Sequence, residues 1–153
     1  PQVRGLPMSQ DPKLNSHSKL NCVIACLQAE AAGADEGLML DPHGFVNTTN
    51  ACNFFIVRRG EVWTSTGDYC MKGVTRQKVI DLCRLDGIPV FEKNFSLYEV
   101  HGADEAFLTG TFGAQTPVAS VDGKPVGNGA RPVTERIRKL YKNLIEETTA
   151  GPH

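Results

Sequence analysis

Apolar residues recur at intervals of three and four in three segments of the chain, which is the spacing of an α-helix. The first segment covers residues 19–32 and is followed by Gly33, and the second covers residues 74–85 and is followed by Gly87. The third begins near Pro132 and continues to about Thr148. Glycine commonly follows a helix and proline commonly begins one, so we predict a helix in each segment.

Short apolar runs separated by turn residues predict β-hairpins between these helices. Three hairpins are expected: 37–40 with 45–47, 53–58 with 61–64, and 116–121 with 124–126. Further strands are expected at 90–95 and 106–108, and a short helix at 97–100. Hairpins interspersed with helices favour an α+β fold on a mixed sheet over a doubly wound parallel sheet.

The length and charge of the chain narrow the classes of protein to which it can belong. The chain has 153 residues, which is the size of one domain, and a net charge of −1 with acidic and basic residues interspersed. This charge gives no reason to expect a nucleic-acid partner. The longest apolar runs, such as 54–57, are too short for a membrane span, so none is expected.

Five cysteines are present, and apolar residues surround them. An odd number in such surroundings predicts free, buried thiols in a reducing compartment, and therefore an intracellular protein of the cytoplasm or an organellar matrix. Cys22 and Cys26 lie one helical turn apart, but no second pair follows at zinc spacing. We therefore expect no metal site.

Residues 53–76 read NFFIVRRGEVWTSTGDYCMKGVTR, and residues 107–113 read FLTGTFG. In this order and spacing the two segments resemble the class IV (fold-type IV) aminotransferases, the pyridoxal-phosphate (PLP) enzymes that include branched-chain and D-amino-acid aminotransferases. The residues Ala103-Asp104-Glu105 and Thr116-Pro117-Val118 also match. The resemblance implies the fold of the family's larger, C-terminal domain, in which a mixed sheet or pseudo-barrel has flanking helices.

The resemblance implies a phosphate site at the start of the second helix. Backbone N–H groups at a helix N-terminus attract phosphate. The expected cofactor-binding residues are Gly73, Val74, Thr75, Gly110 and Thr111, and the amides of Phe112 and Gly113 are expected to face the substrate carboxylate. Arg76, which follows them, is expected on the surface or just behind the site.

Two family positions carry other residues in this chain. The glutamate that pairs with the pyridine ring aligns with Thr48, which can donate a hydrogen bond but carries no charge. The lysine that holds the cofactor aligns with Asn15, and Lys19 lies one turn further along. Lys19 is the candidate catalytic residue as a relocated nucleophile. The alternative is a solvated lysine at a helix start.

The resemblance implies an interdomain linker at residues 1–18 and the larger domain at residues 19–150, with the smaller N-terminal domain absent from this chain. One expected function is PLP-dependent transamination between an amino acid and a 2-oxo acid. The alternative is a catalytically impaired subunit with a structural role in a larger complex. A homodimer or larger assembly is expected, because members of the family are usually dimers.

Overall fold

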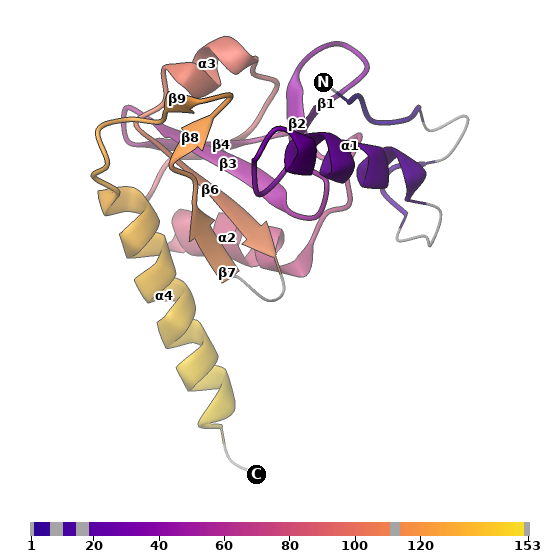
Figure 1. Ribbon diagram of the computed structural model, residues 1–153. Helices are drawn as coiled ribbons and strands as arrows, with labels where there is room; N and C mark the ends of the chain where they lie inside the picture. The colour runs from indigo at the N-terminus through magenta and orange to yellow at the C-terminus, as the bar shows by residue number, and fades with distance from the viewer. Residues whose placement is uncertain (1, 7–10, 15–18, 111–113, 152–153) are drawn as a thin grey trace.

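The computed structural model describes residues 2–6, 11–14, 19–110 and 114–151. Within these residues a sheet of seven strands carries helices on its faces, and two further strands form a separate hairpin (Figure 1). The strands are β1 (Leu38–Leu40), β2 (Val46–Thr49), β3 (Asn53–Arg58), β4 (Glu61–Thr64), β5 (Val90–Glu92), β6 (Glu105–Gly110), β7 (Ala114–Pro117), β8 (Ser120–Val121) and β9 (Lys124–Pro125). The helices are α1 (Leu20–Ala31), α2 (Val74–Leu85), α3 (Leu97–His101) and α4 (Pro132–Thr149).

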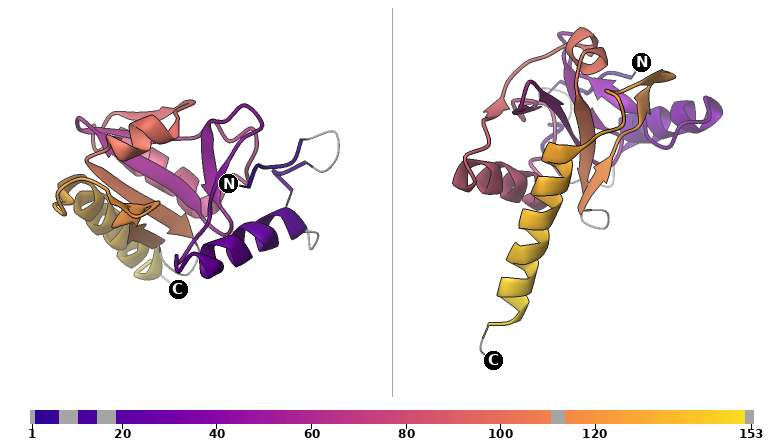
Figure 2. Two further views of the ribbon diagram at one scale, coloured as in Figure 1. Left: turned by 45° about the horizontal axis from the view of Figure 1, so that its top comes forward. Right: turned by 90° about the vertical axis from the view of Figure 1, so that its left-hand side faces the viewer.

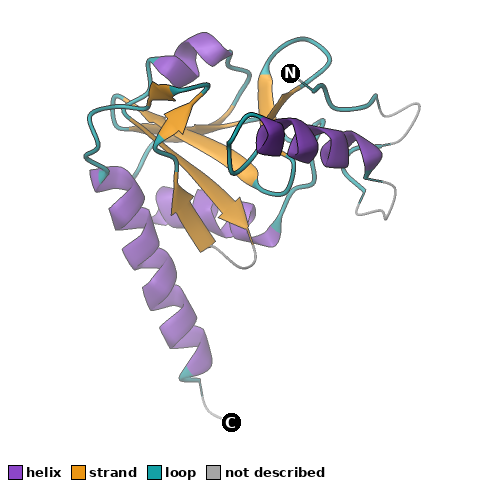
Figure 3. Cartoon of the chain, viewed as in Figure 1, coloured by secondary structure: helices purple, strands orange, loops and turns teal. Residues whose placement is uncertain are grey.

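The predicted α+β fold with a mixed sheet is confirmed. Strands β4 and β5 pair in parallel, whereas β1–β2, β2–β3, β3–β4, β3–β6 and β6–β7 pair antiparallel. The three long helices and the hairpins β1–β2 and β3–β4 lie where the periodicity predicts them. Figure 3 shows how the strands gather into one layer between the helices.

The predicted strand 116–121 is wrong as a single element. Residues up to Pro117 pair with β6, and the chain then leaves the sheet before Ser120 begins the β8–β9 hairpin around Asp122-Gly123. The break lets Val121 and Val126 turn into the core, where both are buried. Burial of these two side chains explains why one apolar run serves two sheets.

Residues 54–57 of strand β3 are all apolar because both faces of the strand are covered. Phe54 and Ile56 face one core, which α3 and the β8–β9 hairpin complete. Phe55 and Val57 face the other core, which lies under α2 and the first part of α4. Side chains alternate between the two faces of a strand, so one run of four apolar residues supplies both cores.

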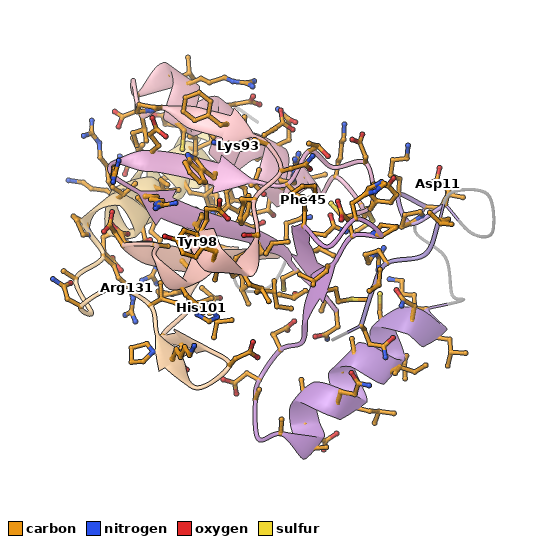
Figure 4. The ribbon with its side chains drawn as sticks, turned by 90° about the horizontal axis from the view of Figure 1, so that it is seen from above. Asp11, Phe45, Lys93, Tyr98, His101 and Arg131 are labelled. Carbon is orange, nitrogen blue, oxygen red and sulfur yellow. The ribbon has the colours of Figure 1, made fainter. Side chains whose placement is uncertain are left out.

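Helix α1 lies beside the sheet, and most of its apolar side is uncovered. Its buried residues are Ala25 and Ala29, and a Cβ added at Gly37 would lie 2.7 Å from the Ala25 carbonyl oxygen. The larger residues Leu20, Val23, Ile24 and Leu27 are exposed. Figure 4 shows α1 apart from the strands, with side chains pointing away from it. Helical spacing therefore predicts this helix but not the face that packs.

Helix α4 begins against the sheet and continues beyond it (Figures 1 and 2). Thr134 and Ile137, in its first turns, are its buried residues. Glu105 on β6 is itself buried and accepts hydrogen bonds from the amides of Val133 and Thr134 at 3.0 and 2.7 Å. This carboxylate therefore satisfies the first turn of α4 from a neighbouring strand.

No helix within the described residues is both long and apolar enough to cross a membrane.

Arg4 connects the beginning of the chain to three other segments. Its guanidinium donates to the carbonyl oxygen of Tyr69 at 2.9 Å, to that of Pro12 at 2.9 Å and to the sulfur of Cys22 at 2.7 Å. The backbone beside it pairs with the edge of β1 at Leu40. Residues 2–4 are therefore attached to the edge of the sheet, and Arg4 also reaches α1.

All five cysteines are free, but the prediction that they are buried holds for two of them. Cys70 and Cys83 are buried, Cys22 and Cys52 are half-buried, and Cys26 is exposed on α1. The exposure of Cys26 follows from the uncovered side of that helix.

Burial, and then the charge of Asp86, raise the pKa of the Cys83 thiol from 9.0 to about 12. Below pH 9 the thiol is neutral in both the folded and the unfolded chain. Between pH 9 and about pH 12 only the unfolded chain loses the proton, so the free energy of unfolding should fall by about 1.4 kcal/mol per pH unit through this group. Urea unfolding of the wild type and of Cys83→Val across this range checks the prediction. Parallel pH profiles for the two proteins would contradict it.

Candidate functional site

The first turn of α2 is open to solvent. Gly73 is its N-cap in an extended conformation, with φ −61° and ψ 149°, and no side chain among the described residues caps the turn. Val74, the first residue of the helix, is 74% exposed. The first amides of a helix have no acceptor within the helix, so this turn presents backbone donors to an anion.

Asn53 on β3 positions the segment that leads into this turn. Its side-chain amide donates to the carbonyl oxygen of Met71 at 3.0 Å. A Cβ added at Gly73 would lie 2.8 Å from the Oδ1 atom of Asn53, closer than van der Waals contact allows. Glycine at position 73 therefore lets the helix start approach the end of the sheet.

Gly73→Ala should reduce the free energy of unfolding by about 1 kcal/mol, because the new methyl group displaces Asn53 and breaks its bond to Met71. In an Asn53→Gly background the same change should be neutral or stabilising by about 0.5 kcal/mol, since alanine restricts the unfolded chain. Chemical denaturation of the four proteins measures this coupling. Equal costs of Gly73→Ala in both backgrounds would refute the contact.

Four polar residues form a row across the end of the sheet. Thr48 on β2 lies opposite Asn53, Asn53 lies opposite Thr109 on β6, and Thr109 lies opposite Gln115 on β7. Cross-strand partners project from the same face of a sheet, so the four side chains share the face that α2 covers. We define these four residues as the polar row.

The sequence-predicted residues Thr48, Gly73 and Gly110 meet around the start of β3. Gly73 contacts Asn53, and a Cβ added at Gly110 would lie 3.1 Å from the sulfur of Cys52. Burial, and then the charge of Glu36, raise the pKa of the Cys52 thiol, although a hydrogen bond with Thr49 opposes this. The thiol beside Gly110 is therefore neutral at physiological pH.

Thr48 uses its hydroxyl within the fold. The Oγ1 atom donates to the carbonyl oxygen of Cys52 at 2.6 Å, and the side chain is buried. A hydroxyl whose proton is engaged in this way offers only a lone pair to another group. Thr48 therefore has neither the charge nor the free proton of a carboxylic acid.

The expectation that Arg76 lies on the surface or just behind the site is wrong as to the surface. Arg76 is completely buried, and its Nη2 atom donates to the carbonyl oxygen of Ser65 at 2.8 Å and to Glu92 at 2.9 Å. It therefore ties the first turn of α2 to the end of β4 and to β5. The charge of the side chain suggested exposure, and no local pattern marks Glu92 as its partner.

Lys19 lies immediately before α1, and its side chain is exposed. This side chain forms no hydrogen bond or ion pair with any described residue, and so none with Asn53 or Gly73. Asn15 and the segment 111–113, which holds Thr111, Phe112 and Gly113, lie outside the described residues. The structure thus brings Thr48, Gly73 and Gly110 together, and it places Lys19 at the start of a different helix.

Sequence reasoning missed Asn53, Thr109 and Gln115 as members of this arrangement. Each lies at or next to the end of a strand. Thr109 and Gln115 are buried, and a buried polar residue is a signal of a site or of a specific contact. The cross-strand register that unites them is not visible in the sequence. Among the described residues, no three His, Cys, Asp or Glu side chains are grouped as metal ligands would be.

Residues 1–121 match the protein family described as amino-transferase class IV. The chain belongs to this family. Branched-chain-amino-acid aminotransferase-like protein 2 of Arabidopsis thaliana is 39% identical over 144 residues, which cover 94% of this chain and 26% of the plant protein. The branched-chain-amino-acid aminotransferase of Pseudomonas aeruginosa is 40% identical over 131 residues, which cover 85% of this chain and 43% of the bacterial one.

The fold also matches members of the family with known structures. The branched-chain amino acid aminotransferase from Thermobaculum terrenum, solved in its PLP-bound holo form, superposes with a TM-score of 0.89 at 31% identity. The superposition covers 94% of this chain and 48% of that enzyme. The chain therefore spans between a quarter and a half of the length of these relatives, and it has the fold of the corresponding part of a branched-chain aminotransferase.

The described residues fit a phosphate-bearing cofactor. The donors of the first turn of α2 are backbone amides without a capping side chain, and Gly73 and Gly110 leave the ends of α2 and β6 free of side chains. A phosphate group needs such donors and such close approach to the backbone.

Proposed function

We propose that this chain is the cofactor-binding part of a PLP-dependent aminotransferase that exchanges an amino group between an amino acid and a 2-oxo acid. The observation that carries the proposal is the open first turn of α2, positioned by Asn53 and Gly73. Membership of the class IV family and the fold shared with a relative solved in its PLP form support it.

The candidate residues divide between the phosphate, the substrate carboxylate and the pyridine ring. The phosphate is held by the amides of Val74 and Thr75 together with Gly73, Gly110 and Thr111. The substrate carboxylate is held by the amides of Phe112 and Gly113. Thr48 contacts the pyridine ring. When bound, PLP supplies the electron sink that stabilises negative charge at the substrate α-carbon. Lys19 would hold the cofactor through its Nζ atom, and the same amine, once the substrate amino group had displaced it, would be free to carry the proton from that carbon.

We further propose that residues 1–18 form an interdomain linker and that residues 19–150 form the larger domain of the family. The protein is then expected to act as a homodimer or in a larger assembly. Size-exclusion chromatography with light scattering tests the assembly.

A second candidate function is a subunit that retains the fold without transamination. The side chain of Lys19 is exposed and unpaired among the described residues, and the hydroxyl of Thr48 is bonded to Cys52. Both observations favour this candidate. A catalytic lysine is normally fixed in place by neighbouring groups, and a group that pairs with the pyridine ring needs a free donor or a charge. Such a subunit would contribute to a larger complex through packing.

Titration of the purified protein with PLP, followed by borohydride reduction and peptide mass spectrometry, separates the two functions. The enzyme predicts a visible absorbance band and a reduced adduct on Lys19, both lost in Lys19→Ala and kept in the matched variant Lys13→Ala. Pyridoxal without the phosphate should bind at least about tenfold more weakly, because it makes no contact with the helix N-terminus. If no lysine carried an adduct, transamination by this chain would be rejected and the structural subunit would be favoured.

A further inference from the structure

The guanidinium of Arg4 uses all three of its nitrogens, each on a different segment of the chain. The Nε atom donates to the carbonyl oxygen of Tyr69, Nη1 donates to the sulfur of Cys22, and Nη2 donates to the carbonyl oxygen of Pro12. None of these three partners is a carboxylate. The fixed fork of donors in the guanidinium, rather than attraction to an opposite charge, therefore determines these contacts.

Both Arg4 and its acceptor on Tyr69 are held by the sheet. The backbone amide of Arg4 donates to the carbonyl oxygen of Leu40 on β1 at 2.9 Å, and the amide of Leu40 donates to the carbonyl oxygen of Gln2 at 3.2 Å. The carbonyl oxygen of Tyr69 also accepts from the side-chain amide of Asn47, a buried residue of β2, at 2.8 Å. The contact between Arg4 and Tyr69 therefore has a fixed place at this end of the sheet.

Tyr69 belongs to the loop that leads to the candidate phosphate site. It lies four residues before Gly73, the N-cap of α2. Between them, the carbonyl oxygen of Met71 accepts from Asn53 on β3. The loop is thus attached to β2 through Tyr69 and to β3 through Met71, so a group bound to Tyr69 is fixed relative to the first turn of α2.

The other two acceptors of Arg4 lie at the two ends of one segment. Pro12 comes directly before Lys13, and Cys22 lies three residues after Lys19, in the first turn of α1. The segment 12–22 therefore includes Lys19, which is assigned above to the cofactor, and one guanidinium binds both of its ends. Arg4 thereby connects the lysine-bearing segment to the loop before α2.

We propose that Arg4 is a positioning residue for the amine of Lys19. Through its three contacts it sets the distance between this amine and the first turn of α2, without touching the cofactor itself. This inference rests on the proposed function, because it requires a phosphate-bearing aldehyde on α2 and a lysine that attaches to it. Reacting groups must be held in the right geometry for such a step to be fast.

The first measurement is the rate at which PLP becomes attached to Lys19 in the wild type, Arg4→Ala and Arg4→Lys. The lysine amine condenses with the aldehyde and releases water, and borohydride then reduces the new double bond, so that mass spectrometry can count the product. Attachment should be at least about tenfold slower in both variants. Lysine keeps the positive charge, but its single nitrogen cannot reproduce the fork of three donors.

The second measurement separates positioning from a general loss of structure. Inorganic phosphate is titrated into the isotope-labelled protein, and NMR follows the amides of Val74 and Thr75. The affinity should change by less than about twofold in Arg4→Ala, because backbone amides bind the phosphate and Asn47 and Asn53 still hold the loop. An affinity for phosphate that fell as much as the rate of attachment would overturn the positioning role.

The third measurement needs no cofactor. Because Arg4 binds Cys22, Arg4→Ala should speed amide hydrogen exchange in α1 at least about fivefold and leave exchange in β3 unchanged. Arg138→Ala is the matched control, since this arginine is exposed on α4 and pairs with Glu135 at the surface. It should leave the rate of attachment, the affinity for phosphate and the exchange of α1 unchanged.

The outcomes distinguish failure of this inference from failure of the proposed function. If the wild type forms no adduct, the proposed function fails, and the exchange of α1 alone then decides whether Arg4 fixes this helix. If the wild type forms the adduct and Arg4→Ala forms it at the same rate, the positioning role is overturned while the proposed function stands. Equal exchange of α1 in the wild type and in Arg4→Ala would overturn it as well.

Discussion

Glu92→Ala should lower the free energy of unfolding by about 3 kcal/mol, although Glu92 is an acidic residue at the surface of the sheet. Its partner Arg76 is fully buried, and with Glu92 gone the guanidinium keeps only a neutral acceptor, the carbonyl oxygen of Ser65, among the described residues. Leaving a buried charge without an opposite charge is among the most destabilising effects that a single substitution can have. Urea denaturation followed by circular dichroism measures the loss.

The double variant Arg76→Met, Glu92→Ala should regain much of this loss, because the buried charge is then absent. Arg84→Ala is the matched control. Arg84 also lies near Glu92, at 3.8 Å, but its side chain is 57% exposed, so the cost should be at most about 0.5 kcal/mol. A Glu92→Ala cost as small as that of Arg84→Ala would contradict the role assigned to Arg76.

Glu105→Ala should cost about 3 kcal/mol as well, and for a different reason. The Glu105 carboxylate accepts from two amides at the start of α4 and from the hydroxyl of Thr134 at 2.6 Å. Its removal leaves these donors without a partner, and those of Thr134 are buried. The loss should appear both in urea denaturation and in faster amide hydrogen exchange throughout α4.

Glu105→Gln keeps the shape of the side chain and one acceptor oxygen, so it should cost about 1 kcal/mol. Glu135→Ala is the matched control, because Glu135 also lies in the first turn of α4 but is exposed and pairs with Arg138 at the surface. Its expected cost is at most about 0.5 kcal/mol. If Glu105→Ala accelerated exchange everywhere except in α4, the capping role would be wrong.

Local patterns were sufficient to predict most helices and strands of this chain. Apolar spacing located α2 and α4, and turn residues such as Arg59-Gly60 located the hairpins, because both signals act over a few neighbouring residues. The break after Pro117 escaped prediction, because it depends on where Val121 is buried rather than on the residues at the break.

Part of the candidate site could likewise be predicted from the sequence, and part of it could not. The glycines at 73 and 110 could be located by resemblance, because close approach to a backbone leaves a mark in the sequence. Asn53 and Gln115 could not be connected, since a strand register unites them across distant parts of the chain. The pairing of Arg76 with Glu92 is likewise a tertiary contact, and charge alone suggested the opposite environment.

The two cores share β3, so neither core can open without disturbing the strand that completes the other. Global unfolding should therefore be a single transition, with the amides of β3 the last to exchange. Helix α1 contributes to neither core and is attached mainly through Ala25, Ala29 and the contact between Arg4 and Cys22. It should act as a separate foldon that opens at a lower free energy while the sheet stays intact.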